Sequence, residues 1–228
     1  MKHSHSIEKQ IGILQEQMRR AGRALSEEKV SRFSLFAERL LAWNQRTNLI
    51  SKRDEAHIVT HHILDSLAIL DVFPLKQGAH VIDIGTGAGF PGIPLFIDRP
   101  DLHMVLLDSK RMKTLFLRDV VSELGLSRVE VVNQRAEMAA QNERYAARFD
   151  YVLSRAVSDL KIVYEWSAGF TSDSACIVAI KGGDLIGEVN RFQKAYPDVP
   201  VQMIPVTSGL AVKDRVLIVI KSALNSGG

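Results

Sequence analysis

A glycine-rich loop with two nearby carboxylates is the part of the sequence best suited to chemistry. Residues 81–93 read Val-Ile-Asp-Ile-Gly-Thr-Gly-Ala-Gly-Phe-Pro-Gly-Ile, so a short apolar run leads into four closely spaced glycines. Glycines let a chain turn sharply and let a ligand approach the backbone, and the free amides of a helix start would face that ligand. Asp83 precedes the first glycine, and Asp108 ends the next apolar run. The segment predicts a strand-loop-helix site for a cofactor that contains a nucleoside.

Two cofactors are compatible with this loop. The glycines at 87, 89 and 92 match the Gly-x-Gly-x-x-Gly pattern of dinucleotide sites, with Asp108 placed to hold a ribose. Read from Asp83, the pattern is Asp-x-Gly-x-Gly, and a carboxylate there attracts an ammonium and a sulfonium but repels a pyrophosphate. The sequence therefore favours S-adenosylmethionine, with an NAD-dependent oxidoreductase as the alternative. The carboxylate of Asp83 is expected to face the cationic amino-acid end of the cofactor.

Strands and helices alternate around this loop and would position it. Apolar runs predict strands at 80–84, 103–107, 129–132, 151–154, 175–180 and 215–220, with a weaker candidate at 202–206. Amphipathic segments predict helices at 93–98, 112–124, 159–170 and 185–195. This alternation predicts an α/β fold with a Rossmann-like, mostly parallel sheet of seven strands, covered on both faces. In such a sheet the ligand crevice lies at the carboxyl ends of the strands.

Residues 1–73 have a helical pattern and predict an N-terminal helical extension packed on the core. Apolar residues recur at helical spacing before residue 20, and Ser26 is placed to cap a second helix. A further helical segment is expected at 54–71. Residues 74–225 would then form the cofactor-binding domain.

Composition excludes several classes of protein. The chain has 228 residues, 46% of them hydrophobic, and no apolar run approaches the roughly 20 residues of a membrane span. Its start is polar and unlike a signal peptide. The one cysteine, Cys176, excludes an internal disulfide, and its apolar surroundings favour a buried thiol over a nucleophile. We expect a cytoplasmic globular protein, and the net charge of +3 permits an anionic partner.

Several blocks in the chain together resemble one family. They are 48–54 (Asn-Leu-Ile-Ser-Lys-Arg-Asp), 61–67 (His-His-Ile-Leu-Asp-Ser-Leu), 83–92, 107–109 (Leu-Asp-Ser), 135–137 (Arg-Ala-Glu) and 154–156 (Ser-Arg-Ala). In this order they resemble the ribosomal RNA small subunit methyltransferase G family, also called glucose-inhibited division protein B. The resemblance implies the class I S-adenosylmethionine-dependent methyltransferase fold. It also implies methyl transfer to guanine N7 in 16S ribosomal RNA, at the position conventionally numbered 527, with small-subunit ribosomal RNA or the ribosomal particle as partner.

The resemblance carries cofactor-binding positions over to this sequence. Gly85 and Phe90 in the loop, Ala136 and Glu137 after the third strand, and Arg155 at the end of the fourth match positions that contact the cofactor in the family. The expected cofactor-binding set, with the loop residues included, is Asp83, Gly85, Gly87, Gly89, Phe90, Asp108, Ala136, Glu137 and Arg155. Arg155 is also the expected catalytic residue, as a positioning group. Its guanidinium could pair with the cofactor carboxylate, contact guanine O6 or a phosphate, or hold a structural carboxylate.

Guanine N7 suits this sequence better than other methyl acceptors. Its lone pair lies in the ring plane and carries no proton, so its methylation needs positioning and no general base. Enzymes that methylate exocyclic amines usually offer an Asn/Asp-Pro-Pro-aromatic clamp after the fourth strand, where this chain has Ser154-Arg-Ala-Val. Carbon methylation would need a nucleophilic cysteine, and Cys176 lies inside a predicted strand. A non-catalytic RNA-binding module on the same fold is a further hypothesis, against which the intact Asp83, glycines and Asp108 argue.

Polar and basic side chains near the expected crevice are candidates for contact with RNA. They are Asn48, Lys52, Arg53, Lys110, Arg111, Lys113 and Lys181. A polar turn, a solvated helix face or a solvated strand end would also explain them. Adjacent histidines point about 100° apart on a helix, so His61 and His62 predict no metal site. One is expected near Asp65 and the other facing the crevice or RNA, and we expect the protein to be a monomer.

Overall fold

The computed structural model describes residues 2–155, 158–183, 185–210 and 215–221. In that part of the chain, strands form one sheet in the order β3-β2-β1-β4-β5-β7-β6. The strands are β1 (His80–Ile84), β2 (His103–Asp108), β3 (Val129–Asn133), β4 (Phe149–Arg155), β5 (Thr171–Lys181), β6 (Val201–Pro205) and β7 (Val216–Lys221). The pairs from β3 to β5 are parallel, and β7 runs antiparallel to both β5 and β6. This confirms the predicted α/β fold with a mostly parallel sheet.

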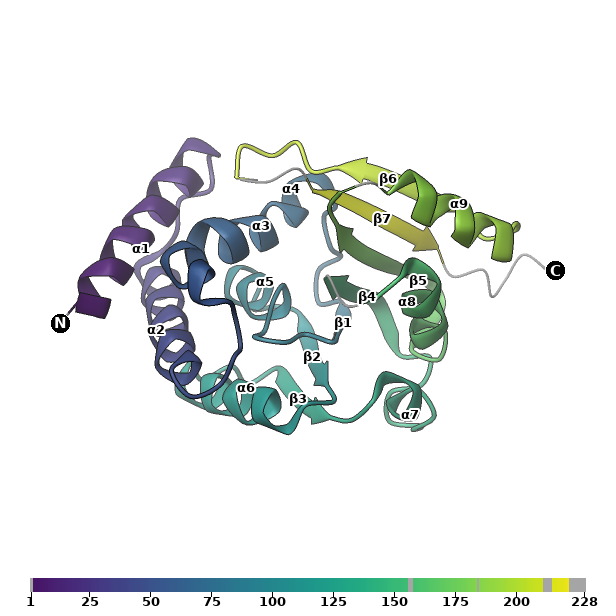
Figure 1. Ribbon diagram of the computed structural model, residues 1–228, viewed down its shortest axis with the longest axis horizontal. Helices are drawn as coiled ribbons and strands as arrows, with labels where there is room; N and C mark the ends of the chain where they lie inside the picture. The colour runs from purple at the N-terminus through teal and green to yellow at the C-terminus, as the bar shows by residue number, and fades with distance from the viewer. Residues whose placement is uncertain (1, 156–157, 184, 211–214, 222–228) are drawn as a thin grey trace.

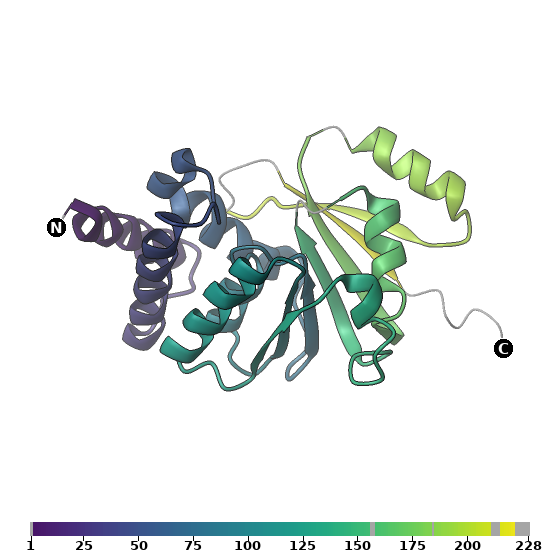
Figure 2. The ribbon, with the colours of Figure 1, turned by 60° about the horizontal axis from the view of Figure 1, so that its bottom comes forward.

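Helices lie on both faces of the sheet (Figure 1, Figure 2). The helical turns before the sheet are α1 (Lys2–Arg20), α2 (Glu27–Asn44), the 3-10 helix η1 (Lys52–His57), the π-helix η2 (Val59–Ile63), α3 (Leu64–Leu67) and α4 (Ile69–Val72). Those between the strands are α5 (Gly92–Asp98), α6 (Arg111–Glu123), α7 (Ala136–Ala139), α8 (Leu160–Ser167) and α9 (Ile186–Ala195). Among the described residues, no helix has the length and apolarity needed to cross a membrane.

The strands divide their side chains between two hydrophobic clusters. In β1, Val81 belongs to the cluster that contains α5 and α6, whereas Ile82 and Ile84 belong to the cluster that contains α8 and α9. The same alternation continues in β2 between Leu106 and Leu107. Successive side chains of a strand point to opposite faces, and because both faces are covered, the strands read as continuous apolar runs.

The N-terminal helices share the first of these clusters with the sheet. Leu14 of α1 and Phe33 and Phe36 of α2 are fully buried there, together with Ile93 of α5. Helix α2 begins after Ser26, whose side chain accepts a hydrogen bond from the backbone N–H of Lys29, as the sequence predicted. The division of the chain near residue 73 stays a prediction, because one continuous core joins the two parts.

The carboxylate of Asp98, at the end of α5, anchors the turn between α1 and α2. Its side chain is 10% exposed and forms ion pairs with Lys29 at 2.8 Å and with Arg23. Lys29 also donates to the backbone carbonyl of Asp98 at 2.7 Å. One carboxylate thus holds two cations of the N-terminal helices against the helix that follows the glycine loop.

The structure departs from the predicted elements in several places: the helix expected at 159–170 ends at Ser167, and the strand expected at 175–180 already begins at Thr171. Segment 54–71, expected as one helix, is divided among η1, η2, α3 and α4, and the short helix α7 was not predicted. An apolar pattern shows which side of a segment is buried but does not distinguish 3-10, α and π hydrogen bonding, and four residues are too few for a periodicity. Ala156 and Val157 of the fourth-strand motif, and the expected domain end at 225, lie outside the described residues.

We expect Asp98→Ala to lower the free energy of unfolding by about 2 kcal/mol, because it removes the carboxylate that pairs with Lys29 and one of the two carboxylates that pair with Arg23. Urea denaturation of wild type and variant measures the difference. Glu16→Ala is the control, since its ion pairs with Arg19 and Arg20 lie in solvent and contribute little. If the two variants unfold at the same urea concentration, Asp98 is not an anchor.

Candidate functional site

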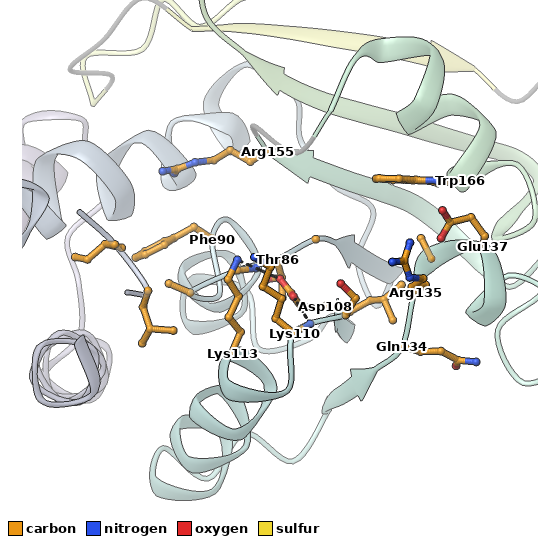
Figure 3. A pocket seen from close by; sticks show the side chains of 18 of the residues that line it. Thr86, Phe90, Asp108, Lys110, Lys113, Gln134, Arg135, Glu137, Arg155 and Trp166 are labelled. Atoms are coloured by element: carbon orange, nitrogen blue, oxygen red, sulfur yellow. Dashed lines mark hydrogen bonds and ion pairs between the residues drawn. The ribbon is translucent and has the colours of Figure 1, made fainter. Parts of the chain in front are cut away.

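A cavity of about 460 Å³ opens at the carboxyl ends of the strands (Figure 3). The sheet order places β1 beside β4, with β2 and β3 on one side and β5 on the other. The connections leave β1 and β4 in opposite directions at this point, which is where open α/β sheets form their ligand crevice. The glycine loop, the ends of β2 and β4, and the segment after β3 all contribute to the lining.

The carboxylate of Asp83 lies behind the glycine loop. Its side chain is fully buried, and Oδ2 accepts hydrogen bonds from the Thr86 hydroxyl at 2.6 Å and the Gly92 N–H at 2.9 Å. Oδ1 has no hydrogen-bond partner among the described residues, and burial raises the pKa of Asp83 to about 7, against the lowering effect of the two hydrogen bonds. Asp83 was expected to face a ligand. In the structure its carboxylate instead joins β1 to the first turn of α5.

Three glycines of the loop have backbone angles that other residues avoid. Gly85 has a φ of 66°, Gly87 a φ of 63° and Gly89 a φ of 86°, in the left-handed region where glycine is unstrained. A Cβ on Gly89 would lie 2.7 Å from the side chain of Ile93, so this glycine allows α5 to pack against the loop. Gly85 and Gly87 line the cavity, whereas Gly89 supports it from behind.

Asp108, the last residue of β2, presents a fixed carboxylate to the cavity. It is 5% exposed, and its two oxygens accept hydrogen bonds from the N–H of Gly87 at 3.0 Å and of Lys110 at 2.8 Å. The ammonium of Lys113 lies 3.6 Å away. A carboxylate oxygen accepts two hydrogen bonds, so each oxygen keeps a lone pair for a ligand hydroxyl.

Arg155, His62 and Phe90 form a cluster at one end of the cavity. The guanidinium of Arg155 contacts the ring Nδ1 of His62, donates to the His62 carbonyl at 3.5 Å and lies 5.4 Å from the centroid of the Phe90 ring. His62 stacks on Phe90 with ring centroids 4.8 Å apart. Burial lowers the pKa of Arg155. In Figure 3 its side chain points toward the N-terminal helices, which supply this wall.

The opposite end of the cavity is formed after β3. Ala136 and Glu137, which the resemblance gives as cofactor contacts, line the cavity here, and Figure 3 shows Arg135 and Glu137 near Trp166 of α8. Of the nine residues expected to bind cofactor, those that line the cavity are Gly85, Gly87, Phe90, Asp108, Ala136, Glu137 and Arg155.

The residues expected to contact RNA lie in three places. Lys110 and Lys113 line the cavity, and Arg111 is exposed between them at the start of α6. A second group, Asn48, Lys52 and Arg53, is exposed just before and within η1, where Lys52 pairs with Glu55 at 2.9 Å.

Lys181 lies away from both groups, and its ammonium binds partners inside the protein. It pairs with Glu188 of α9 at 2.7 Å and donates to the carbonyl of Ser158, and Glu188 also accepts from the N–H of Leu160 at 2.6 Å. With both charged groups largely buried, this pair ties the end of β5 to the starts of α8 and α9. The structure thus differs from the expectation that Lys181 contacts RNA.

Of the two adjacent histidines, His62 lines the cavity, and both have ring nitrogens within 4.0 Å of Asp54 instead of the expected Asp65. His61 Nδ1 lies 3.0 Å from Asp54, whereas Asp65 accepts a hydrogen bond from Arg215 at 3.1 Å. Hydrogen bonds from Ser51 and His61 lower the pKa of Asp54 to about 2.

Sequence reasoning missed part of the lining. Thr86, Gln134, Trp166 and the pair Leu49 and Ile50 border the cavity. The available signals were weak: Thr86 lies inside the glycine loop, and Trp166 is a tryptophan on the first helix after the fourth strand. Leu49 and Ile50 read as ordinary apolar residues, since only the packing of α2 and η1 brings them to the loop.

Comparison with known proteins finds one family along most of the chain. A family model described as rRNA small subunit methyltransferase G matches residues 29–213. A protein named Ribosomal RNA small subunit methyltransferase G from Desulfitobacterium hafniense is 40% identical over 171 residues, covering 75% of this chain and 70% of that protein. The protein of that name from Thermoanaerobacter pseudethanolicus is 35% identical over 191 residues, covering 84% and 80%. A solved SAM dependent methyltransferase from Aquifex aeolicus has the same fold, with a TM-score of 0.55 at 17% identity, covering 75% of this chain and 95% of that one.

The position of Asp83 predicts a pH-dependent stability. The pKa of Asp83 in the folded protein, about 7, lies above its ordinary value of 3.8. The contribution of this side chain to the free energy of unfolding is therefore fully present below about pH 4 and is lost as the pH rises through 7. Asp83→Asn keeps a neutral side chain throughout. We expect the variant to gain about 2 kcal/mol relative to wild type between pH 5.5 and 8. Urea unfolding of both proteins at the two pH values measures this, and parallel pH profiles would contradict it.

Proposed function

The chain belongs to the rRNA small subunit methyltransferase G family, and from that premise we propose that it transfers a methyl group from S-adenosylmethionine to N7 of a guanine in 16S ribosomal RNA, at the position conventionally numbered 527. One observation carries the proposal: every residue that lines the cavity, from Leu49 to Trp166, lies within the segment 29–213 that matches the family. The cavity is therefore formed entirely by the segment that matches the family.

The lining of the cavity fits S-adenosylmethionine. Its volume of about 460 Å³ lies in the range of small-molecule sites. Asp108 offers acceptors for ribose hydroxyls, the loop offers backbone groups at Gly85 and Gly87, and Arg155 offers a cation for the amino-acid carboxylate. Solved S-adenosylmethionine-dependent methyltransferases share the fold of this chain, which favours S-adenosylmethionine over NAD as the occupant.

The reaction requires the protein to position the methyl donor and the guanine, and it requires no proton transfer. When bound, S-adenosylmethionine supplies an electrophilic methyl group on a positively charged sulfur. The protein must hold the lone pair of guanine N7 in line with the carbon–sulfur bond, at about 3 Å from the methyl carbon. The new bond forms at N7 as the carbon–sulfur bond breaks, and the positive charge passes to the guanine ring. No base is required for this step.

Arg155 is the proposed positioning residue for this step. His62 and Phe90 restrict its guanidinium on two sides, and of the five N–H groups of a guanidinium only two are directed at His62, so other donors remain. They can bond guanine O6 or the cofactor carboxylate, and either contact would fix the angle between the two reactants. Cys176 offers no competing covalent route, because burial raises the pKa of its thiol and it lies in β5, outside the cavity lining.

Basic side chains around the cavity are the proposed contacts for ribosomal RNA. Lys110, Arg111 and Lys113 lie at the start of α6, and Lys52 and Arg53 lie on η1. These two segments come from different parts of the chain. Lys110 and Lys113 line the cavity, and so do Leu49 and Ile50, which precede η1. Cations on both sides of the opening would attract a phosphate backbone while leaving the target base free to enter.

Asp108→Ala should weaken binding of S-adenosylmethionine by about ten- to a hundredfold, because it removes a charged acceptor for ribose hydroxyls. Calorimetric titration measures the affinity. Since Asp108 also holds the N–H groups of Gly87 and Lys110, the melting temperature of the variant is recorded beside it. Asp198→Ala, on the exposed turn after α9, is the control and should bind as wild type does. An unchanged affinity in a folded Asp108→Ala protein would exclude the ribose contact.

The product itself is the test of the proposed function. N7-methylguanosine carries a positive charge that makes the nucleoside labile to borohydride followed by aniline. Small-subunit RNA incubated with protein and S-adenosylmethionine should therefore break at one guanine, and RNA that lacks either component should stay intact. Mass mapping of the same RNA locates the methyl group. A label on an exocyclic amine, a ribose or a protein, without an aniline-sensitive guanine, would refute the assignment.

A further inference from the structure

A second cavity, of about 360 Å³, lies at the other end of the strands from the first, where their amino ends are. His80 and His103, the first residues of β1 and β2, border it, together with the segments that precede β3 and β4. Strand β2 runs from the second cavity to the first, and its length separates the two cavities by roughly 17 Å. The amino ends of the strands form this cavity, so it is separate from the proposed methyl-transfer site.

Arginines dominate the charge of this cavity. Arg128, Arg144 and Arg148 line it, and Glu130 is the one acidic residue among the described residues of the lining. Glu130 is already engaged, because it pairs with Arg144 at 2.9 Å and accepts a hydrogen bond from the Tyr145 hydroxyl at 2.7 Å. The lining therefore has an excess of positive charge.

Arg128 and Arg148 carry that excess. Each donates to a backbone carbonyl, Arg128 to Asp101 at 3.2 Å and Arg148 to Arg144 at 3.4 Å. Neither has an ion pair with a carboxylate in the part of the chain that the structure describes, and both are exposed. A carbonyl orients a guanidinium without neutralising it, so the remaining donors of both residues can bind an anion.

Two stacked imidazoles complete the lining. The rings of His80 and His103 lie 4.5 Å apart and 7° from parallel. Burial, with His80 and Arg128 beside it, lowers the pKa of His103. The N–H of His80 donates to Asp150 at 2.9 Å. Protonating His103 beside Arg128 is therefore unfavourable, and a bound anion would remove that penalty.

The edge strand connects the two cavities. Strand β3 is at the end of the sheet order, with Arg128 directly before it and Arg135, which lines the first cavity, shortly after it. A polyanion that crosses this edge would meet guanidinium groups at both ends of the strand. An isolated phosphate would use only one of the two positions.

We propose that the cavity at the amino ends of β1, β2 and β3 binds backbone phosphates of the RNA substrate, as a second contact distant from the methyl-transfer site. The identity of the polyanion as RNA rests on the proposed function. Two arginine forks without carboxylate partners supply the charge-assisted hydrogen bonds that phosphate oxygens accept. The contact adds affinity and orients the RNA, and it leaves cofactor binding unchanged.

The salt dependence of RNA affinity tests the proposal. The Arg128→Gln/Arg148→Gln double variant is compared with wild type for binding to deproteinised small-subunit ribosomal RNA between 50 and 300 mM salt. Each lost phosphate contact changes the log-log slope by about 0.7, so we expect a slope less negative by about 1.4 and an affinity about tenfold weaker at low salt. The Arg128→Lys/Arg148→Lys variant keeps both charges and should retain most of the slope.

A matched control removes the same charge elsewhere. Arg19→Gln/Arg20→Gln changes two exposed arginines on α1, far from either lining, and should leave the slope as in wild type. Binding of S-adenosylmethionine is measured for every variant and should not change. If Arg128→Gln/Arg148→Gln has the slope of the control, the second contact does not exist. Loss of methyl transfer by the wild type would instead overturn the proposed function, so the two failures are distinguishable.

The pKa of the His103 imidazole can be measured to show which anion occupies the second cavity. In the NMR spectrum of the wild type, its pKa should rise when an RNA fragment is added, because a nearby phosphate stabilises the protonated ring. Inorganic phosphate is added in a second titration at equal phosphate concentration. A rise with RNA that exceeds the rise with inorganic phosphate supports the proposal. An equal or larger rise with inorganic phosphate would show a site for small anions and overturn it.

Discussion

The contact between the carboxylate of Asp83 and the N–H of Gly92 determines the shape of the glycine loop, and the cavity depends on that loop. One oxygen of Asp83 accepts both this N–H and the Thr86 hydroxyl, so the end of β1, the middle of the loop and the start of α5 share one acceptor. The constraint is steric as well, because a Cβ on Gly92 would lie 2.4 Å from Leu106. A buried carboxylate with a raised pKa has a cost in stability at neutral pH. In return the loop has one conformation, with its backbone turned toward Asp108.

The N-terminal helices complete a site that the sheet alone would leave open. Trp43 of α2 donates to Asp119 of α6 at 2.8 Å, and Arg39 pairs with Glu123 of the same helix at 2.6 Å. These contacts hold α2 against α6, Phe36 of α2 packs on Phe90 of the loop with ring centroids 5.4 Å apart, and the chain that follows α2 brings His62 onto Phe90 and Arg155. The π-helix that carries His62 widens one helical turn, a feature often found at functional sites. The extension thus sets the orientation of the proposed positioning residue.

The carboxyl ends and the amino ends of the parallel strands differ in their chemical character. At the carboxyl ends, loops and helix starts expose N–H groups and small residues around Asp108, which suits a cofactor. At the amino ends, the segments before β3 and β4 carry arginines beside a histidine pair, which suits phosphates. Strand β3 is at the edge of the sheet, and of the arginines that flank it Arg128 lines the second cavity and Arg135 the first.

The sequence by itself determined the fold class, the strands and the residues of the glycine loop, because these depend on local pattern. Alternation of apolar runs and amphipathic segments predicts a covered parallel sheet, and glycines with positive φ leave a local signature that few other residues can satisfy. Tertiary structure alone decided the direction of side chains and their partners. Asp83 faces α5 and Lys181 faces Glu188, because burial and nearby donors outside their own segments determine where a charged group can be satisfied. His62 and Trp166 join the cavity through packing between elements distant in the chain, for which no single segment holds a pattern.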